Sequence, residues 1–162
     1  MKKILAIVLA AAMLLSMTAC GAAAKKDTYV VGICQLVQHD ALDAATKGFQ
    51  DALTEALGDK VSFEVQNASG ESVNCTTIVN GFVSSKVDLI MANATAALTA
   101  AASATDTIPI LGTSITAYGV ALDIDDFSGT VGGNISGTSD LADLSKQADM
   151  ITEWFPEAQK VA

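Results

Sequence analysis

Residues 29–57, YVVGICQLVQHDALDAATKGFQDALTEAL, decide the fold, because two hydrophobic patterns follow one another there without a Gly or Pro turn between them. The first six residues form a nearly continuous apolar run, which is typical of a buried strand. From Asp40 onward the apolar residues instead recur every three or four positions, at Leu42, Ala45, Phe49, Leu53 and Leu57. This spacing predicts an amphipathic helix that follows the strand directly.

The same alternation continues along the chain. Apolar runs predict strands at 61–65, 87–91 and 108–111 and a short one at 118–122, and helical patterns cover 71–86 and 94–105. Helices between successive strands favour right-handed crossovers, which parallel strands require. We therefore predict an α/β fold, a three-layer parallel sheet with helices on both faces.

The composition of the chain changes in residues 123–140, DIDDFSGTVGGNISGTSD. This segment is rich in glycine and acidic residues and has no helical period. This segment predicts a loop, either a linker between lobes or a binding loop. Ser139 or Asp140 is then expected to cap a helix that runs through Phe155. Residues 159–162 resemble the start of another strand, so we expect the chain to be the N-terminal piece of a longer protein.

The N-terminus has the pattern of an export signal. Lys2 and Lys3 precede the apolar stretch 4–15, which is shorter than the roughly 20 residues that a spanning helix needs. We therefore predict a lipoprotein signal peptide over residues 1–19 and exclude it from the fold.

The cleavage site is more specific than a general one. Residues 17–20, Met-Thr-Ala-Cys, resemble the bacterial lipobox, although Met17 stands where leucine is usual. Cys20 would then carry a lipid and residues 20–27 would form a tether to the membrane. The alternative is an ordinary cysteine next to a signal-peptidase site.

The charge of the chain limits its partners. All nine basic residues are lysines, and without Lys2 and Lys3 seven lysines face eighteen acidic residues. A nucleic-acid partner needs a basic stripe, which this sequence lacks. Of the remaining cysteines, Cys34 and Cys75 form no CxxC motif, so two buried thiols are favoured over a disulfide.

No motif in the chain predicts catalysis. His39 is the single histidine, and neither a GxSxG nucleophile motif nor a P-loop or GxGxxG phosphate cradle is present. Asp123, Asp125 and Asp126 do not match the calcium-binding EF-hand loop. We therefore expect a protein that is not an enzyme and that has no catalytic residue, metal site or cofactor.

Binding geometry is the remaining guide to function. In an open parallel sheet, ligands bind beyond the carboxyl ends of the strands, where each strand passes into a helix. Because the chain has no arginine, a ligand carboxylate would depend on helix N-termini and on hydroxyl groups. Asn93, Thr95 and Ser114 suit that role, but they are equally good helix caps and turn residues. His39 could likewise pack, cap a helix or bind.

Four segments resemble one known family. They are VVGICQLVQHDALDAATKGFQDAL (30–53), ANATAAL (92–98), IPILGTSIT (108–116) and NISGTSDL (134–141). They resemble the ABC-transporter solute-binding lipoproteins of the family that has tryptophan- and tyrosine-binding members. Asp40 departs from the family, which commonly has proline there; both residues favour a helix start.

The resemblance implies a two-lobed type I periplasmic-binding fold with a hinged cleft. The N-terminal ligand-binding lobe would then occupy residues 28–124. Residues 125–162 would contain the hinge crossing and the first helix of a second lobe that is otherwise missing here. Carried over by position, the ligand-binding residues are expected to be Gln35, His39, Asn93, Thr95, Thr113, Ser114, Asn134 and Asp140.

The resemblance also implies a function. Such a protein would be the solute-binding component of an ABC importer that captures tryptophan, tyrosine or a similar molecule and delivers it to an ABC permease. A lipid anchor would hold it on the outer face of the bacterial cell membrane. The alternative is a lipoprotein sensor lobe that presents its ligand state to a membrane signalling protein. A hydrolase would need catalytic residues outside this sequence.

Overall fold

A computed structural model describes residues 27–160, and the predicted signal peptide and most of the tether lie outside them. The strands are β1 (Tyr29–Gln35), β2 (Val61–Asn67), β3 (Leu89–Asn93), β4 (Ile110–Ile115) and β5 (Ile135–Ser139). The α-helices are α2 (Asp40–Leu57), α3 (Ser72–Ser85), α4 (Thr95–Ala104), α5 (Tyr118–Ala121) and α6 (Leu144–Trp154), and the short 3-10 helix η2 (Gly58–Lys60) follows α2. None of the helices in this described part is long and apolar enough to cross a membrane.

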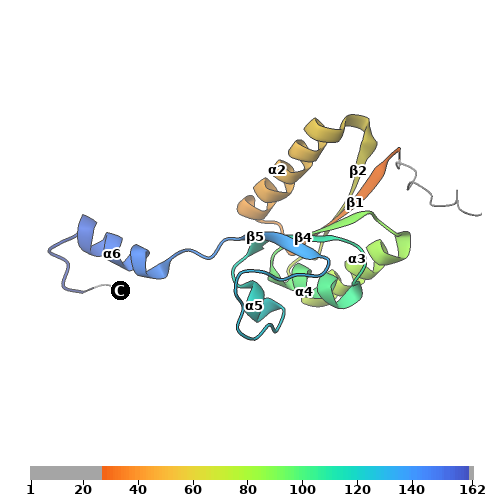
Figure 1. The fold of residues 1–162 in the computed structure, drawn as a ribbon. Coiled ribbons are helices and arrows are strands. Elements are labelled where there is room, and N and C mark those ends of the chain that lie inside the picture. Colours follow the sequence, from red (N-terminus) through yellow and green to blue (C-terminus); the bar gives the residue numbers. More distant parts are fainter. Residues whose placement is uncertain (1–26, 161–162) are drawn as a thin grey trace, which may run out of the picture.

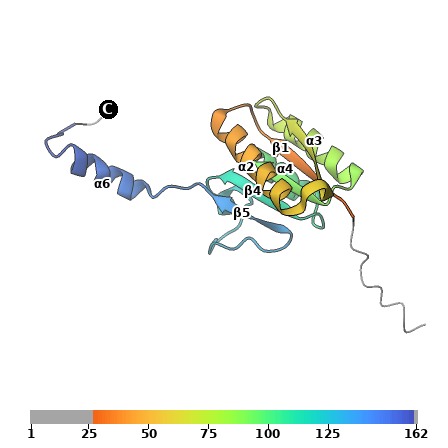
Figure 2. The ribbon, with the colours of Figure 1, turned by 90° about the horizontal axis from the view of Figure 1, so that it is seen from above.

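The five strands form one sheet in the order β2-β1-β3-β4-β5, and every neighbouring pair is parallel. Helix α2 covers one face, while α3 and α4 cover the other (Figure 1). The α/β fold and its three layers are therefore confirmed. The view from above in Figure 2 shows α6 at the end of an extended segment, away from the sheet, and α6 has no buried residue.

The hydrophobic core on one face of the sheet is larger than the core on the other face. Val31, Ile33 and Met91 face α2, where they pack with Phe49 and Leu53. The opposite face has the larger core, in which strand residues meet the small side chains of α4 and the apolar side of α3; its largest fully buried members are Phe82, Ile90, Leu98, Ile110 and Ile115. The small side chains of alanine-rich α4 let its backbone lie close to β3 and β4.

One predicted strand was wrong. Residues 118–122 were expected to form a fifth strand, but α5 occupies Tyr118–Ala121. The Tyr118 side chain turns inward and its hydroxyl donates to the Gly112 carbonyl oxygen at 2.9 Å, while Val120 is 86% exposed. Such a short apolar run has no periodicity that separates a strand from a helical turn.

The real fifth strand lies in the segment that was predicted to be a loop. Strand β5 pairs with β4 in parallel, and Gly112 stands opposite Gly137. A Cβ atom at Gly137 would collide with the Gly112 carbonyl oxygen and the Tyr118 hydroxyl. The sequence ISGTS is polar and contains this glycine, so its composition does not resemble a strand. The sheet thus continues past Ile124, into the range that we had assigned to the hinge crossing.

The last helix begins later than expected. Its N-cap is Asp143, rather than Ser139 or Asp140, and the Asp143 carboxylate accepts hydrogen bonds from the backbone N–H groups of Ser145 and Lys146. The Ser145 hydroxyl, which also donates to this carboxylate, lowers the pKa of Asp143 most, and the backbone bonds lower it further. Residues 159–160 are in neither helix nor strand, and 161–162 lie outside the described residues.

The two cysteines of the folded part are free and fully buried, as predicted. Cys34 ends the apolar run of β1, and Cys75 faces it from α3 within the same core. Burial, with the neighbouring Cys75 thiol as a smaller cause, raises the pKa of Cys34 from 9.0 to about 12. The pair is therefore neutral and apolar in character at ordinary pH.

Gly32 allows α3 to lie close to β1, which generates a stability prediction. A Cβ atom at Gly32 would lie 2.7 Å from the Phe82 ring, which is 2% exposed and cannot move away freely. We expect Gly32→Ala to lower the free energy of unfolding by about 1–3 kcal/mol. The matched control is Gly48→Ala on α2, where nothing lies within 4 Å, and which should raise stability by about 1 kcal/mol. Urea denaturation of both variants measures the two signs, and a neutral Gly32→Ala would contradict the close approach.

The buried thiols predict a loss of stability in alkali. Because the pKa of Cys34 is higher in the folded protein than its ordinary value of 9.0, the unfolded chain releases this proton first as pH rises. Stability should therefore fall with increasing pH above about 9, and the Cys34→Ala variant should show a shallower fall. Denaturation midpoints measured between about pH 8 and pH 10 test this, and equal slopes for both proteins would disprove it.

Candidate functional site

Polar side chains gather at one edge of the sheet, where all the parallel strands end. The pairing register places Asn67, Gln35, Asn93 and Thr113 next to one another across β2, β1, β3 and β4. Backbone bonds tie the turns that follow them: Leu36 N–H donates to the Asn93 carbonyl oxygen at 3.2 Å, and the Ala94 N–H to that of Thr113 at 3.0 Å. Three of the predicted binding residues thus form a continuous row.

Gln35 and Asn93 are buried, and their amides are engaged by α2. Gln35 Nε2 donates to the Val37 carbonyl oxygen at 2.9 Å and to the Asp43 carboxylate at 2.5 Å. Asn93 is fully buried, and its Nδ2 donates to the Leu42 carbonyl oxygen at 2.8 Å. These bonds fix the start of α2 against the ends of β1 and β3.

His39 is the N-cap of α2. Its Nδ1 accepts a hydrogen bond from the Ala41 N–H at 3.2 Å, and its side chain is exposed. Of the roles that the sequence left open, the structure gives His39 the capping one. In residues 27–160 no hydrogen bond links its ring to a serine, threonine or cysteine, as a nucleophilic mechanism would require.

The turn between β3 and α4 is strained. The N-cap of α4 is Ala94, with φ 94° and ψ 158° and no side-chain hydrogen bond to the helix. This conformation is essentially restricted to glycine. Thr95 is therefore the first helical residue rather than the cap, and its side chain is exposed. The unusual backbone leaves the first N–H groups of α4 without a side-chain cap at this edge.

Strand β4 ends with a second unusual residue. Ser114 is half-buried and has φ 56°, in the left-handed region. The pairing of β4 with β5 shifts between Gly112 and Ile115, which places Ser114 at the irregularity. Left-handed backbone at non-glycine residues is uncommon and is found often at functional sites. Ala94 and Ser114 give neighbouring strands irregular ends at the same edge.

The two remaining predicted residues, Asn134 and Asp140, lie at opposite edges of the sheet. Asp140 follows β5, where its N–H donates to the Ile115 carbonyl oxygen at 3.1 Å, and it is exposed at the same edge as Gln35. Asn134 precedes β5 and donates to the carbonyl oxygens of Thr105 and Ile108 at 3.2 Å and 2.7 Å. It therefore lies at the amino edge of the sheet. The structure does not bring Asn134 together with the other predicted residues.

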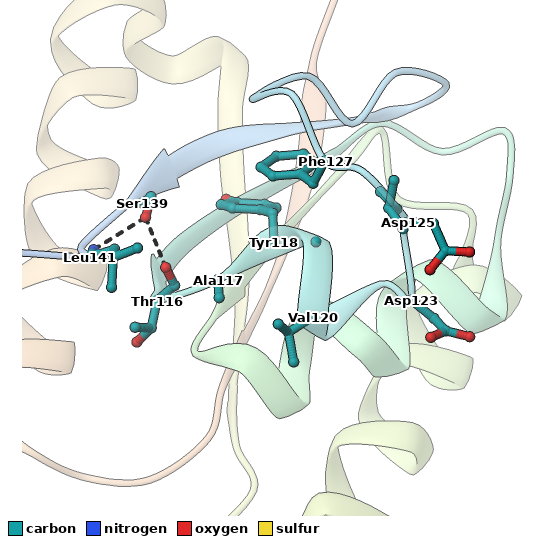
Figure 3. Close-up of a pocket in the computed structure, with 11 residues that line it drawn as sticks. Thr116, Ala117, Tyr118, Val120, Asp123, Asp125, Phe127, Ser139 and Leu141 are labelled. Carbon is teal, nitrogen blue, oxygen red and sulfur yellow. Dashed lines mark hydrogen bonds between the residues drawn. The ribbon is translucent and has the colours of Figure 1, made fainter.

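A hollow beyond β4 and β5 was missed by the sequence analysis (Figure 3). Its volume is about 510 Å³. The Ser139 hydroxyl closes one end by donating to the Thr116 carbonyl oxygen at 3.0 Å and accepting from the Leu141 N–H at 3.1 Å. The lining residues come from the end of β4, from α5, from the loop after it and from the end of β5: Thr116, Ala117, Tyr118, Gly119, Val120, Asp123, Ile124, Asp125, Phe127, Ser139 and Leu141.

The hollow combines apolar and acidic groups. Tyr118 and Phe127 supply aromatic surface, and the carboxylates of Asp123 and Asp125 lie toward one side (Figure 3). Burial raises the pKa of Tyr118 above its ordinary value. No basic residue lines the hollow, so it suits an apolar or cationic group better than a free anion. Only its serine and threonine could have indicated it from sequence.

Comparisons with known proteins agree on one family. The model of the family described as ABC transporter substrate binding protein matches residues 30–162. A tyrosine-binding protein of Clostridioides difficile (strain R20291) is 37% identical over 137 residues, which are 81% of this chain and 39% of that protein.

Two solved structures are similar as well. A substrate binding protein with adhesive properties from Clostridium difficile, in a ligand-free, open form, has a TM-score of 0.73 at 36% identity, over 81% of this chain and 45% of that one. An ABC domain from Streptococcus pneumonia in complex with L-Trp has a TM-score of 0.71 at 32% identity, over 80% of this chain and 44% of that one. The chain thus spans less than half the length of these relatives.

The strained turn at Ala94 predicts an unusual mutant effect. Ala94→Gly should raise the free energy of unfolding by about 1 kcal/mol, because glycine adopts this backbone without steric cost. The control is Ala102→Gly within α4, where the backbone φ is not positive, and it should lower stability by about 1 kcal/mol. Thermal unfolding followed by circular dichroism compares them. Destabilisation by both substitutions would show that Ala94 is not strained.

Proposed function

Since the chain belongs to the ABC transporter substrate binding protein family, we propose that it is the solute-binding component of an ABC importer. It captures a small polar ligand in a cleft between two lobes and delivers it to a permease. The observation that carries this proposal is the row Gln35, Asn93 and Thr113 at the carboxyl edge of an all-parallel sheet. This edge is where open α/β sheets bind ligands.

The ligand that we propose is an aromatic amino acid. The support comes from the relatives, one a tyrosine-binding protein and one solved in complex with L-Trp. The chemistry of the edge agrees with such a ligand, because it offers backbone N–H groups and hydroxyls for a carboxylate and the aromatic surface of Tyr118 and Phe127 nearby. The acidic residues of the same hollow suit an ammonium group.

We propose that residues 28–124 supply most of the first lobe and that 125–162 lead to a second one. The lengths of the relatives support this, since the chain spans 39% to 45% of them. Helix α6 supports it too, because Leu144, Ile151 and Trp154 recur on one side of the helix and are 69%, 38% and 65% exposed. An apolar side of that kind normally packs against another element.

We further propose that the protein works outside the cytoplasm and is anchored by a lipid on Cys20. Proteins of this family are extracytoplasmic. The anchor itself is supported by the lipobox-like sequence alone, since residues 1–26 are outside the described structure. No comparison favours the sensor alternative.

Calorimetric titration of the full-length protein tests the proposal. L-tyrosine or L-tryptophan should bind with a dissociation constant of about 1 µM, while L-glutamate should give no heat of binding. Residues 21–162 alone should bind at least 100-fold more weakly, because half a cleft cannot exclude water from the ligand. If neither L-tyrosine nor L-tryptophan binds, the proposed ligand class is wrong. Micromolar binding by residues 21–162 would instead disprove the two-lobed cleft.

A further inference from the structure

The buried polar residues of the described chain are all in one place. Gln35, Thr46 and Asn93 are the buried polar residues of residues 27–160, with 5%, 7% and 0% of their surfaces exposed. They come from three different elements, β1, α2 and β3, and meet at the carboxyl edge of the sheet. Apart from the Tyr118 hydroxyl and the two cysteine thiols, the polar side-chain groups buried in the described residues lie at the proposed binding edge.

Thr46 is the junction of this group. Its hydroxyl donates to Gln35 Oε1 at 2.6 Å and accepts from Asn93 Nδ2 at 3.0 Å. The hydroxyl can serve both amides because it donates one hydrogen bond and accepts another at the same time. Thr46 lies on α2, between Leu42 and Phe49, in a helical pattern that gives no hint of this contact.

The other hydrogen bonds of each amide agree with this arrangement. Gln35 Nε2 faces two acceptors, the Val37 carbonyl oxygen and the Asp43 carboxylate, so Oε1 must face Thr46. Asn93 Nδ2 donates to both the Leu42 carbonyl oxygen and Thr46. The bonds thus run in one direction, from Asn93 through Thr46 to Gln35.

Asn93 Oδ1 has no partner among the described residues, although it is buried. An unpaired buried acceptor destabilises the free protein, so an apolar side chain would serve packing better. The cost indicates that Asn93 is held at this edge for another reason than stability. The unpaired atom is an acceptor, so the group that satisfies it must be an N–H or O–H donor.

We propose that Thr46 is a positioning residue of the ligand site. Its hydroxyl holds Gln35 and Asn93 in the orientation that the ligand requires, and through them it fixes the turns β1–α2 and β3–α4. This inference rests on the proposed function. A ligand that binds to a preorganised edge does not bear the cost of ordering these side chains.

The test uses the full-length protein with L-tyrosine and L-tryptophan as probes. Thr46→Val removes the hydroxyl and keeps the shape of the side chain. Of the two probes, the one that binds the wild type should bind this variant about tenfold or more weakly. Thr46→Ser keeps the hydroxyl and should stay within about twofold of the wild type. Thr54→Val is the matched control, because Thr54 lies on the same helix, is exposed and has no side-chain hydrogen bond in the described structure; its affinity should not change.

The outcomes separate this inference from the proposed function. A wild-type protein that binds neither probe overturns both. If the wild type binds and Thr46→Val binds equally well, even with a lower unfolding temperature, Thr46 is structural only and this inference fails alone. Should Thr46→Val not fold, Thr46→Cys keeps a weak donor and acceptor in the same position. It should then lose affinity about threefold or more, and unchanged affinity would again overturn the inference.

Discussion

The parallel pairing of β1 with both β2 and β3 is the constraint on which the rest of the structure depends. Because β1 lies between two parallel neighbours, each connection must cross a face of the sheet, and α2 and α3 provide the crossings. The same pairing directs all carboxyl ends to one edge. It therefore fixes both the layers of the fold and the row of Gln35, Asn93 and Thr113. The irregular backbone at Ala94 and Ser114 lies where the strands end.

Much of the fold could be predicted from the sequence, because the hydrophobic period changes clearly between residues 29 and 57 and again in the next two units. Two elements could not. The strand β5 has a polar sequence with a glycine at its centre, and it depends on pairing with β4 and on the Tyr118 hydroxyl rather than on its own propensity. The apolar run at 118–122 is too short for a period, and the inward position of Tyr118 makes it a helical turn.

The candidate site was predicted less completely than the fold. Gln35 and Asn93 could be placed because each ends an apolar run, and strand ends are where ligands bind. Thr46 could not, because its role depends on two residues that are 11 and 47 positions away. Asn134 was grouped with the others through the family resemblance. Because β5 was not recognised, the sequence did not indicate that Asn134 precedes a strand and therefore lies at the amino edge of the sheet. The hollow around Tyr118 depended on the same missing strand.

Because the thiols of Cys34 and Cys75 are buried, a fluorescent dye could be attached at one chosen position of the protein. Both are fully buried, and thiolates rather than thiols react with maleimide dyes, so neither competes for a label in a protein that begins after Cys20. Val120, which is 86% exposed at the rim of the hollow, can then be replaced by a single reactive cysteine. A dye there would be attached to a residue that lines the hollow, so its fluorescence would report changes in the surroundings of the hollow.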